Sequence, residues 1–429
     1  MEPTIYVVGT FDTKSAELFY LRDKLQRALQ RSAITVVSVD ISVHPDSIHN
    51  SPADIGPLDV AAYHPYQHTP ASLFTHDRLE AITNMARALE GFMRQQRHVA
   101  GFLAAGGATG VAILAPALQA LPFGVAKVLV TSLAASDSLN LSGVSGQNLS
   151  GQGRSLMSQG HSLIGQSDLA LISSPCELIG LNRLTETLLS HGAAALAGMI
   201  NTGSVTTKPH KPAICLSSFG FTDACNHWVQ QQLGNDFDCF VFDALGRSAE
   251  AMQHYAQGHQ CRAIIDLAPA DITDALFGNI FSIGSHRLET MLKTKKPYIG
   301  TLGGLDSARF GSPDTLPHEF AERQFYAYTP NITLMRTNRD ENEHIGHWLA
   351  QQLNQSEGPI CLLIPEKGFS ALSVEGQPFY NPDADNALIT TLQSHFETSP
   401  NRQLMSVPYA INDAEFSLAL WENFMAIAH

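Results

Sequence analysis

Short apolar runs rich in β-branched residues alternate with longer segments whose apolar residues recur at helical spacing throughout the first half of the chain. Because these runs are apolar on both faces, they predict a parallel sheet covered by helices on either side. The predicted strands are Thr4–Val8, Ile34–Val39, Val99–Ala104 and Lys127–Thr131. The predicted helices run from Asp12 to about Gln30, from Asp77 to Arg97, from the glycines at 106–110 to Leu121, and from Leu181 to Met199.

The same alternation restarts after Thr202–Pro212, a segment that contains Gly, Thr, Lys and two prolines. We therefore expect an α/β protein with two Rossmann-like subdomains, each a mostly parallel sheet flanked by helices: an N-terminal domain at 1–201, a linker at 202–212 and a C-terminal domain at 213–429. Gly303–Pro330 is predicted to be irregular. The predicted strands of the second domain are Ala213–Ser217, Cys239–Asp243, Ala263–Leu267, Tyr298–Thr301, Ile360–Ile364 and Gln403–Val407. Its predicted helices are Thr222–Leu233, Ser248–Gly258, Ser285–Lys293, Thr337–Asn354, Ala384–Phe396 and Asp413–Ala428.

Two segments of the first domain break this rhythm. His44–Thr75 is rich in Pro, His, Asp and Ser and is predicted to be a long loop, whose histidines lack the spacing of a metal site. Ser136–Gln166 is rich in Gly, Ser and Gln. Its composition is typical of a flexible surface loop, and a lid over a nearby site is the functional alternative.

The composition and net charge of the chain limit the kinds of molecule that it is expected to bind. Apolar residues make up 44% of the 429 residues, and 26 Lys and Arg stand against 40 Asp and Glu, for a net charge of −14. This balance argues against a nucleic-acid partner held by bulk electrostatics, but it allows an anionic ligand bound locally by backbone amides. No apolar run approaches the ~18 residues that a membrane span requires. Without a basic signal-peptide region or a C-x-x-C pair among the six cysteines, we expect a cytoplasmic protein.

The strongest local signal is Gly106-Gly107-Ala108-Thr109-Gly110, which follows a predicted strand and opens a helix. Glycines permit a tight turn and close approach of the backbone to a ligand, and unpaired N–H groups at a helix start suit phosphate. The Thr109 hydroxyl could donate to the ligand or meet a metal ion. The dipeptide Gly-Lys of a Walker A loop is absent, and Ala105 and Ser132 stand where an NAD fingerprint needs glycine and an acid. Simple packing of the turn is the alternative.

A second turn of this kind is Gly9-Thr10-Phe11-Asp12-Thr13-Lys14. The carboxyl ends of parallel strands lie along one edge of a sheet, so both turns can face one crevice. Lys14 could pair with phosphate, and Asp12 could either hold Mg²⁺ or cap the helix. We therefore predict that turns 9–14 and 106–110 hold phosphate groups, with Ser132 at the end of the neighbouring strand as a further contact.

The second domain offers candidates for acid–base or substrate contacts. Asp306 follows Gly303-Gly304-Leu305 after a predicted strand, and Lys367 follows another predicted strand. They are the candidate catalytic residues of a cleft between the domains, although no sequence spacing fixes their geometry.

Many segments occur in the same order as in a known family. They are Gly9–Lys14, the glycine loop with Pro116–Lys127, Ile179–Arg183, Phe281–Gly284, Arg287–Glu289, Thr333–Thr337, Lys367–Leu372 and Phe379–Asp385. In these residues the chain resembles the Tm-one-like ATP-binding domain family, which includes the N-terminal inhibitory domain of the tomato mosaic virus resistance protein. The resemblance covers nearly the whole chain. It implies two α/β subdomains, ATP or a related nucleotide as ligand, and a homodimer, but no settled reaction.

Three functions follow as hypotheses. The first is a nucleotide-binding protein that holds ATP, with or without Mg²⁺, at the two turns of the first domain. The second is a metabolic enzyme that acts on a small carboxylated or phosphorylated substrate between the domains. The third is a protein-interaction module that nucleotide stabilises.

Overall fold

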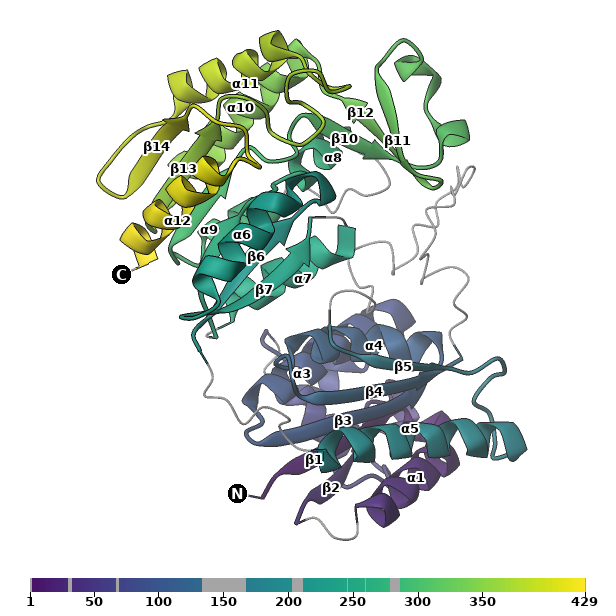
Figure 1. Cartoon of the computed structure of the whole chain (residues 1–429). Helices are drawn as coiled ribbons and strands as arrows, with labels where there is room; N and C mark the ends of the chain where they lie inside the picture. Colours follow the sequence, from purple (N-terminus) through teal and green to yellow (C-terminus); the bar gives the residue numbers. More distant parts are fainter. Residues whose placement is uncertain are drawn as a thin grey trace. The chain divides into compact units, whose positions relative to one another are not determined.

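The computed structural model describes residues 2–29, 33–66, 69–132, 167–202, 211–244, 246–258, 260–277 and 286–428. They divide into two compact units, one up to residue 202 and one from residue 211 onward. Each unit is built on a parallel sheet flanked by helices, which confirms the predicted fold class (Figure 1). No helix in the described part of the chain is long and apolar enough to cross a membrane.

The first unit contains a five-stranded, all-parallel sheet in the order β2-β1-β3-β4-β5. Its strands are β1 (Thr4–Gly9), β2 (Thr35–Asp40), β3 (Val99–Gly106), β4 (Ala126–Thr131) and β5 (Ala170–Ser173). After β1 the chain proceeds to β2 on one side and returns to β3 on the other. The strand order therefore reverses between β1 and β3, and in open α/β sheets ligands bind outside the carboxyl ends of the strands at such a point.

Helices cover both faces of this sheet. They are α1 (Phe11–Ala28), α2 (Pro57–Ala61), α3 (Arg78–Gln95), α4 (Ala108–Ala120) and α5 (Arg183–Asn201), with short 3-10 helices η1 (Pro45–Ser47) and η2 (Pro70–Leu73). Alternate residues of β1 face opposite layers: Val7 packs with the core under α1 and α5, and Val8 packs with the core under α3 and α4. This double burial explains why the strands are apolar throughout.

The first unit differs from the sequence prediction in two details. The predicted loop at 44–75 contains α2 and the two 3-10 helices, and β5 was not expected. With four residues, β5 is too short to show a period in the sequence. The glycine-rich stretch Ser136–Gln166 lies outside the described residues.

The second unit contains a six-stranded parallel sheet in the order β14-β13-β9-β8-β6-β7. Its strands are β6 (Ala213–Ser218), β7 (Asp238–Asp243), β8 (Cys261–Asp266), β9 (Tyr298–Thr301), β13 (Ile360–Pro365) and β14 (Arg402–Val407). Its helices are η3 (Gly220–Thr222), α6 (Asp223–Leu233), α7 (Gly246–Gln257), α8 (Asp271–Phe277), α9 (His286–Leu292), α10 (Arg339–Asn354), α11 (Pro382–His395) and α12 (Ala414–Ala428).

The prediction that 303–330 is irregular was wrong in part. Three antiparallel strands, in the order β10-β12-β11, form a small sheet here: β10 (Ser307–Phe310), β11 (Phe325–Thr329) and β12 (Ile332–Arg336). Between β10 and β11 the chain forms the 3-10 helices η4 (Pro313–Thr315) and η5 (His318–Phe320). In strands of only four or five residues, the alternation of apolar and polar residues is too short to be recognised in the sequence.

Candidate functional site

The glycine loop of the first unit joins β3 directly to α4. Gly107 is the N-cap of α4, with φ of −90°, and no side chain caps the helix. The amide of Val111 donates to the carbonyl of Gly107 at 2.9 Å, as in a regular first turn. The three preceding amides, of Ala108, Thr109 and Gly110, have no hydrogen-bond acceptor among the residues that the structure describes. Toward the described part of the chain, the loop therefore presents three N–H groups without an acceptor and the positive end of the helix dipole.

Packing does not require glycine at every position of the two turns. A Cβ built on Gly107 would have Ser132 Oγ at 3.5 Å and Glu177 Oε2 at 3.6 Å as its nearest atoms, which are ordinary contacts. A Cβ on Gly110 would meet no atom of the described chain within 4 Å. A Cβ on Gly9, in contrast, would lie 2.7 Å from the methyl carbons of Leu18. No described residue would block a side chain at Gly107 or Gly110, whereas Gly9 is required for packing.

The two turns lie next to each other, as the sequence predicted for the carboxyl edge of a parallel sheet. Val8 pairs with Ala104 in the register of β1 and β3. A Cβ built on Gly9 would lie 3.1 Å from the carbonyl oxygen of Ala105. The beginning of α1 and the beginning of α4 therefore flank the point where the strand order reverses.

The amides of residues 11 to 14, however, already have acceptors. The Phe11 amide donates to Asp40 Oδ1 at 3.0 Å, and the Asp12 amide donates to Ser42 Oγ at 3.1 Å. The next two amides donate to the carbonyl oxygen of Thr10. Asp40 is 1% exposed and ends β2, so it caps α1 from another part of the chain. This turn can offer a ligand its side chains, but not these amides.

The polar side chains of this turn are two hydroxyls, one ammonium group and one carboxylate. The hydroxyls of Thr10 and Thr13 are 3.0 Å apart. Lys14 has non-helical backbone angles, and its Nζ donates to the carbonyl oxygen of Leu178 at 2.6 Å. Asp12 is exposed at the start of α1. Within the described ranges no group of three or more His, Cys, Asp or Glu could hold a metal ion, so Mg²⁺ at Asp12 would need oxygens of the ligand and water.

The connection between β5 and α5 runs beside both turns. Glu177 Oε2 accepts a hydrogen bond from Ser132 Oγ at 2.8 Å, and Leu178 is the acceptor for Lys14. The amide of Gly180 donates to Glu17 Oε1 on α1. Ser132 lies beside the glycine loop, and its hydroxyl donates to a carboxylate that the sequence did not single out; its contact with a ligand stays a prediction.

Arg78 is a second residue that sequence reasoning missed. It is the first residue of α3, and its Nη2 donates to Thr109 Oγ1 at 3.0 Å. Its guanidinium is exposed beside the glycine loop and makes no other hydrogen bond or ion pair within the described ranges, so it can meet an anion there. Its place in the sequence could have drawn attention to it. A cation in the first turn of a helix is unfavourable because it opposes the helix dipole, so its presence there suggests a role other than stabilising the helix.

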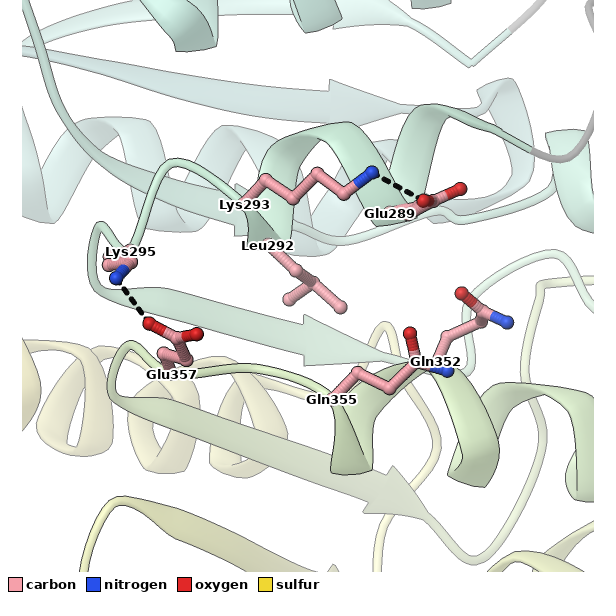
Figure 2. A pocket seen from close by; sticks show the side chains of 7 residues that line it. All are labelled: Glu289, Leu292, Lys293, Lys295, Gln352, Gln355 and Glu357. Carbon is pink, nitrogen blue, oxygen red and sulfur yellow. Dashed lines mark hydrogen bonds and ion pairs between the residues drawn. The ribbon is translucent and has the colours of Figure 1, made fainter.

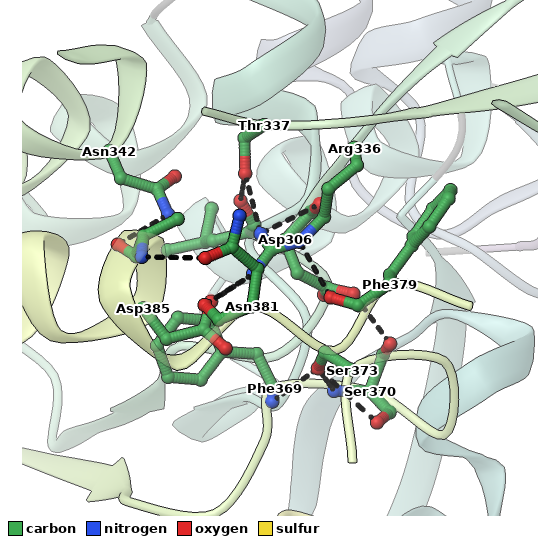
Figure 3. Close-up of polar contacts among 12 residues, drawn as sticks. Asp306, Arg336, Thr337, Asn342, Phe369, Ser370, Ser373, Phe379, Asn381 and Asp385 are labelled. Atoms are coloured by element: carbon green, nitrogen blue, oxygen red, sulfur yellow. Dashed lines mark hydrogen bonds and ion pairs between the residues drawn. The ribbon is translucent and has the colours of Figure 1, made fainter. Parts of the chain in front are cut away.

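In the second unit, Asp306 belongs to a buried polar network (Figure 3). It is 0% exposed, and its Oδ2 accepts a hydrogen bond from Ser370 Oγ at 2.7 Å. Its carbonyl oxygen accepts from Arg336 Nη1 at 3.2 Å, and Nη2 of the same arginine donates to Asp385 Oδ1 at 2.5 Å. Burial raises the pKa of Asp306, and burial also raises the pKa of Asp385 to about 7. The network joins β10, β12 and α11 in the interior.

Lys367 stands apart from this network. It is exposed after β13, and its Nζ lies 5.9 Å from the ring centre of Tyr409. No hydrogen bond or ion pair joins Lys367 to Asp306 among the described residues. A shared catalytic role for the two residues remains a prediction, and the complete burial of Asp306 indicates a structural role.

A surface pocket of about 120 Å³ lies on the second unit (Figure 2). Two of its lysines form ion pairs with neighbouring glutamates. It is formed at the segments that enter β9 and β13, on the amino-terminal edge of the sheet, whereas ligands of α/β sheets bind at the carboxyl edge. We therefore assign no ligand to it. Its lining residues are Glu289, Leu292, Lys293, Lys295, Gln352, Gln355 and Glu357.

Comparison with known proteins gives matches along nearly the whole chain. The family model described as the N-terminal domain of the uncharacterised protein family UPF0261 matches residues 3–145, and the model of its C-terminal domain matches residues 211–428. A UPF0261 protein of Mesorhizobium japonicum is 33% identical over 416 residues, which cover 97% of each chain. Another from Rhizobium meliloti is 33% identical over 425 residues, which cover 99% of each. The ToMV resistance protein Tm-1 of Solanum lycopersicum is 31% identical over 446 residues, which cover 99% of this chain and 56% of the tomato protein.

Proposed function

Because this chain belongs to the UPF0261 family, we propose that its first unit binds the phosphate groups of a nucleotide, with ATP as the first candidate, at the start of α4. The observation that carries the proposal is the set of three unpaired amides at Ala108, Thr109 and Gly110 beside the strand-order reversal. Such amides form a ready anion site, because they point toward the ligand and the helix dipole favours negative charge.

Two cations support the assignment of a phosphate-bearing ligand. Arg78 reaches the loop through its hydrogen bond to Thr109, and its planar guanidinium suits bidentate contact with phosphate. Lys14 lies at the neighbouring turn and uses one of its three donors for Leu178. In a chain with a net charge of −14, these two cations supply positive charge that can pair with a bound phosphate group.

One carboxylate opposes the ligand. Glu177 Oε2 would lie 3.6 Å from a Cβ on Gly107, so a phosphate at the loop would meet its negative charge. A bound Mg²⁺ would offset this repulsion, and the oxygens of Asp12, Glu177 and Ser132 are of the hard type that Mg²⁺ prefers. We therefore propose the Mg²⁺ complex of the nucleotide as the ligand.

Isothermal titration of the full chain tests this function. We expect saturable binding of ATP in the presence of Mg²⁺ and weaker binding of ATP in EDTA. Inorganic triphosphate with Mg²⁺ should retain part of the affinity, because the proposed contacts are to phosphate. The absence of heat and of a thermal shift at millimolar ATP with Mg²⁺ would reject the proposal.

A second candidate function is a protein-interaction surface whose state depends on nucleotide. It is favoured by the exposure of three apolar side chains next to the site: Ile179 at 72% and Leu181 at 40% on the connection, and Leu184 at 42% in the first turn of α5. The homodimer expected from the resemblance is the simplest form of such a surface. Light scattering with and without MgATP tests it, and a monomer mass for both samples would reject a homodimer.

A further inference from the structure

Two cysteines of the second unit lie in contact in its interior. Cys215 is in β6 and Cys261 begins the neighbouring strand β8, and their sulfur atoms are 3.4 Å apart. They are 0% and 2% exposed, respectively. All six cysteines of the chain are free thiols, and no other two are joined by such a contact within the described residues.

The surroundings make the two thiols chemically unequal. The hydrogen bond shared with Cys215 and the charge of Lys296 lower the pKa of Cys261, against the effect of burial. The same hydrogen bond, together with burial, raises the pKa of Cys215. Lys296 is held in place because its Nζ donates to the carbonyl oxygens of Ala256 and Gly258 at 2.5 Å. Cys261 is therefore suited to be the attacking thiolate and Cys215 the second thiol.

Lys296, whose charge acts on Cys261, lies at the surface of the second unit. A hollow of about 570 Å³ opens on the surface of the second unit, and Lys296 is part of its lining. Lys296 thus faces the hollow and also acts on Cys261, the first residue of its strand. The other lining residues are Gln257, Thr290, Lys293 and Thr294.

We propose that Cys215 and Cys261 form a peroxide-reactive dithiol that closes to an intrachain disulfide. The Cys261 thiolate attacks one oxygen of hydrogen peroxide, an S–O bond forms, the O–O bond breaks, and the hydroxide takes up a proton to leave as water. The Cys215 sulfur then loses its proton and attacks the sulfenic sulfur. The S–S bond forms as the S–O bond breaks and a second water leaves, so both sulfurs are oxidised and the peroxide is reduced.

Closure requires a limited movement. The two sulfurs must approach from 3.4 Å to about 2.05 Å. The pairing of β6 with β8 shifts register between Ala213 and Ile214, and Cys261 is the partner of Ala213. Such an irregularity bends a strand locally and leaves the ladder incomplete. Cys215 itself lies opposite Ile264 in this register, so the two cysteines are diagonal neighbours and the backbone at the start of β8 must move for the disulfide to form.

Thiol counting after peroxide treatment tests the proposal on the full chain. The reduced protein is treated with hydrogen peroxide, quenched, unfolded and titrated for free thiols, and its peptides are mapped by mass spectrometry. We expect the six thiols to fall by two, a Cys215–Cys261 linkage, and recovery of all six with dithiothreitol. Six remaining thiols, or disulfides joining other cysteines instead, would overturn it.

Matched variants separate the two roles. In Cys215→Ser, Cys261 should stop at the sulfenic acid and react with dimedone, whereas Cys225→Ser should form the disulfide as the wild type does. Cys225 is a suitable control because it is equally buried in the same unit. If circular dichroism shows that Cys215→Ser does not fold, the disulfide map of the wild-type protein still shows whether Cys215 and Cys261 become linked. None of these readouts depends on nucleotide binding by the first unit.

Discussion

The Arg78 guanidinium donates a hydrogen bond to the Thr109 hydroxyl, 31 residues further along the chain. This contact places a positive charge at the free amides of α4, although α3 and α4 begin at different strands of the sheet. If the site binds phosphate, Arg78→Ala should weaken MgATP binding about 10- to 100-fold, because hydrogen bonds to charged groups contribute ~1.5–3 kcal/mol.

The matched control for Arg78→Ala lies on the same helix. Arg94 is exposed and pairs only with Glu90 one turn away, so Arg94→Ala should leave the affinity unchanged. Titration calorimetry of both variants compares them directly. Equal affinities for the wild type and Arg78→Ala would remove Arg78 from the site.

Gly107 and Gly9 should respond differently to a larger side chain. Gly107→Val places its Cβ at ordinary contact distances, so the protein should fold and lose MgATP binding as the side chain enters the ligand space. Gly9→Val would collide with Leu18 at 2.7 Å and should lower the free energy of unfolding by ~1–3 kcal/mol. Urea unfolding and calorimetry on both variants check this; a Gly107→Val protein that binds MgATP normally contradicts the site.

The Glu177 carboxylate should make binding dependent on Mg²⁺. Glu177→Gln keeps an oxygen that can accept from Ser132 but removes the negative charge near the loop. We expect ATP binding in EDTA to strengthen by about 3- to 10-fold, since removing a like charge near a protein surface is worth roughly 1 kcal/mol. The affinity for MgATP should change less. An unchanged affinity in EDTA would show that Glu177 does not face the ligand.

The buried network of the second unit predicts a pH dependence of stability. The pKa of Asp385 is raised to about 7 in the folded protein from its ordinary 3.8, so folding favours the protonated acid. The unfolded chain binds fewer protons between these values, and stability therefore falls as pH rises from about 4 through 7. Asp385→Asn removes this contribution, which is on the order of 2 kcal/mol between pH 5 and pH 8.

Urea unfolding at pH 5 and pH 8 measures this difference. The exposed Asp383, in the same first turn of α11, provides the control substitution to Asn. The wild type and Asp383→Asn should lose stability in parallel, and Asp385→Asn should lose less. If all three proteins lose the same amount of stability, a group other than Asp385 causes the pH dependence.

The sequence predicted those elements whose pattern of apolar residues is contained in one continuous segment. Runs such as that of β3 are apolar at every position because helices cover both faces, and this pattern predicted the parallel sheets. The strands of the small sheet β10-β12-β11 have only four or five residues, and their pairing depends on partners that no local pattern reveals.

The site was predictable only in part for a similar reason. The turns 9–14 and 106–110 look alike as strand-to-helix junctions, but Asp40, which is 29 residues from Phe11, accepts the hydrogen bond of the Phe11 amide, and Ser42 accepts that of Asp12. Nothing in the 9–14 segment itself indicates this cap. Arg78 and Glu177 likewise reach the glycine loop only through tertiary contacts.

A crystal of the full chain grown with MgATP is the decisive experiment for the phosphate site. We expect phosphate oxygens within about 3 Å of the amide nitrogens of Ala108, Thr109 and Gly110, with the Arg78 guanidinium in contact. A triphosphate bound elsewhere on the protein, with these amides covered by protein atoms, would contradict it.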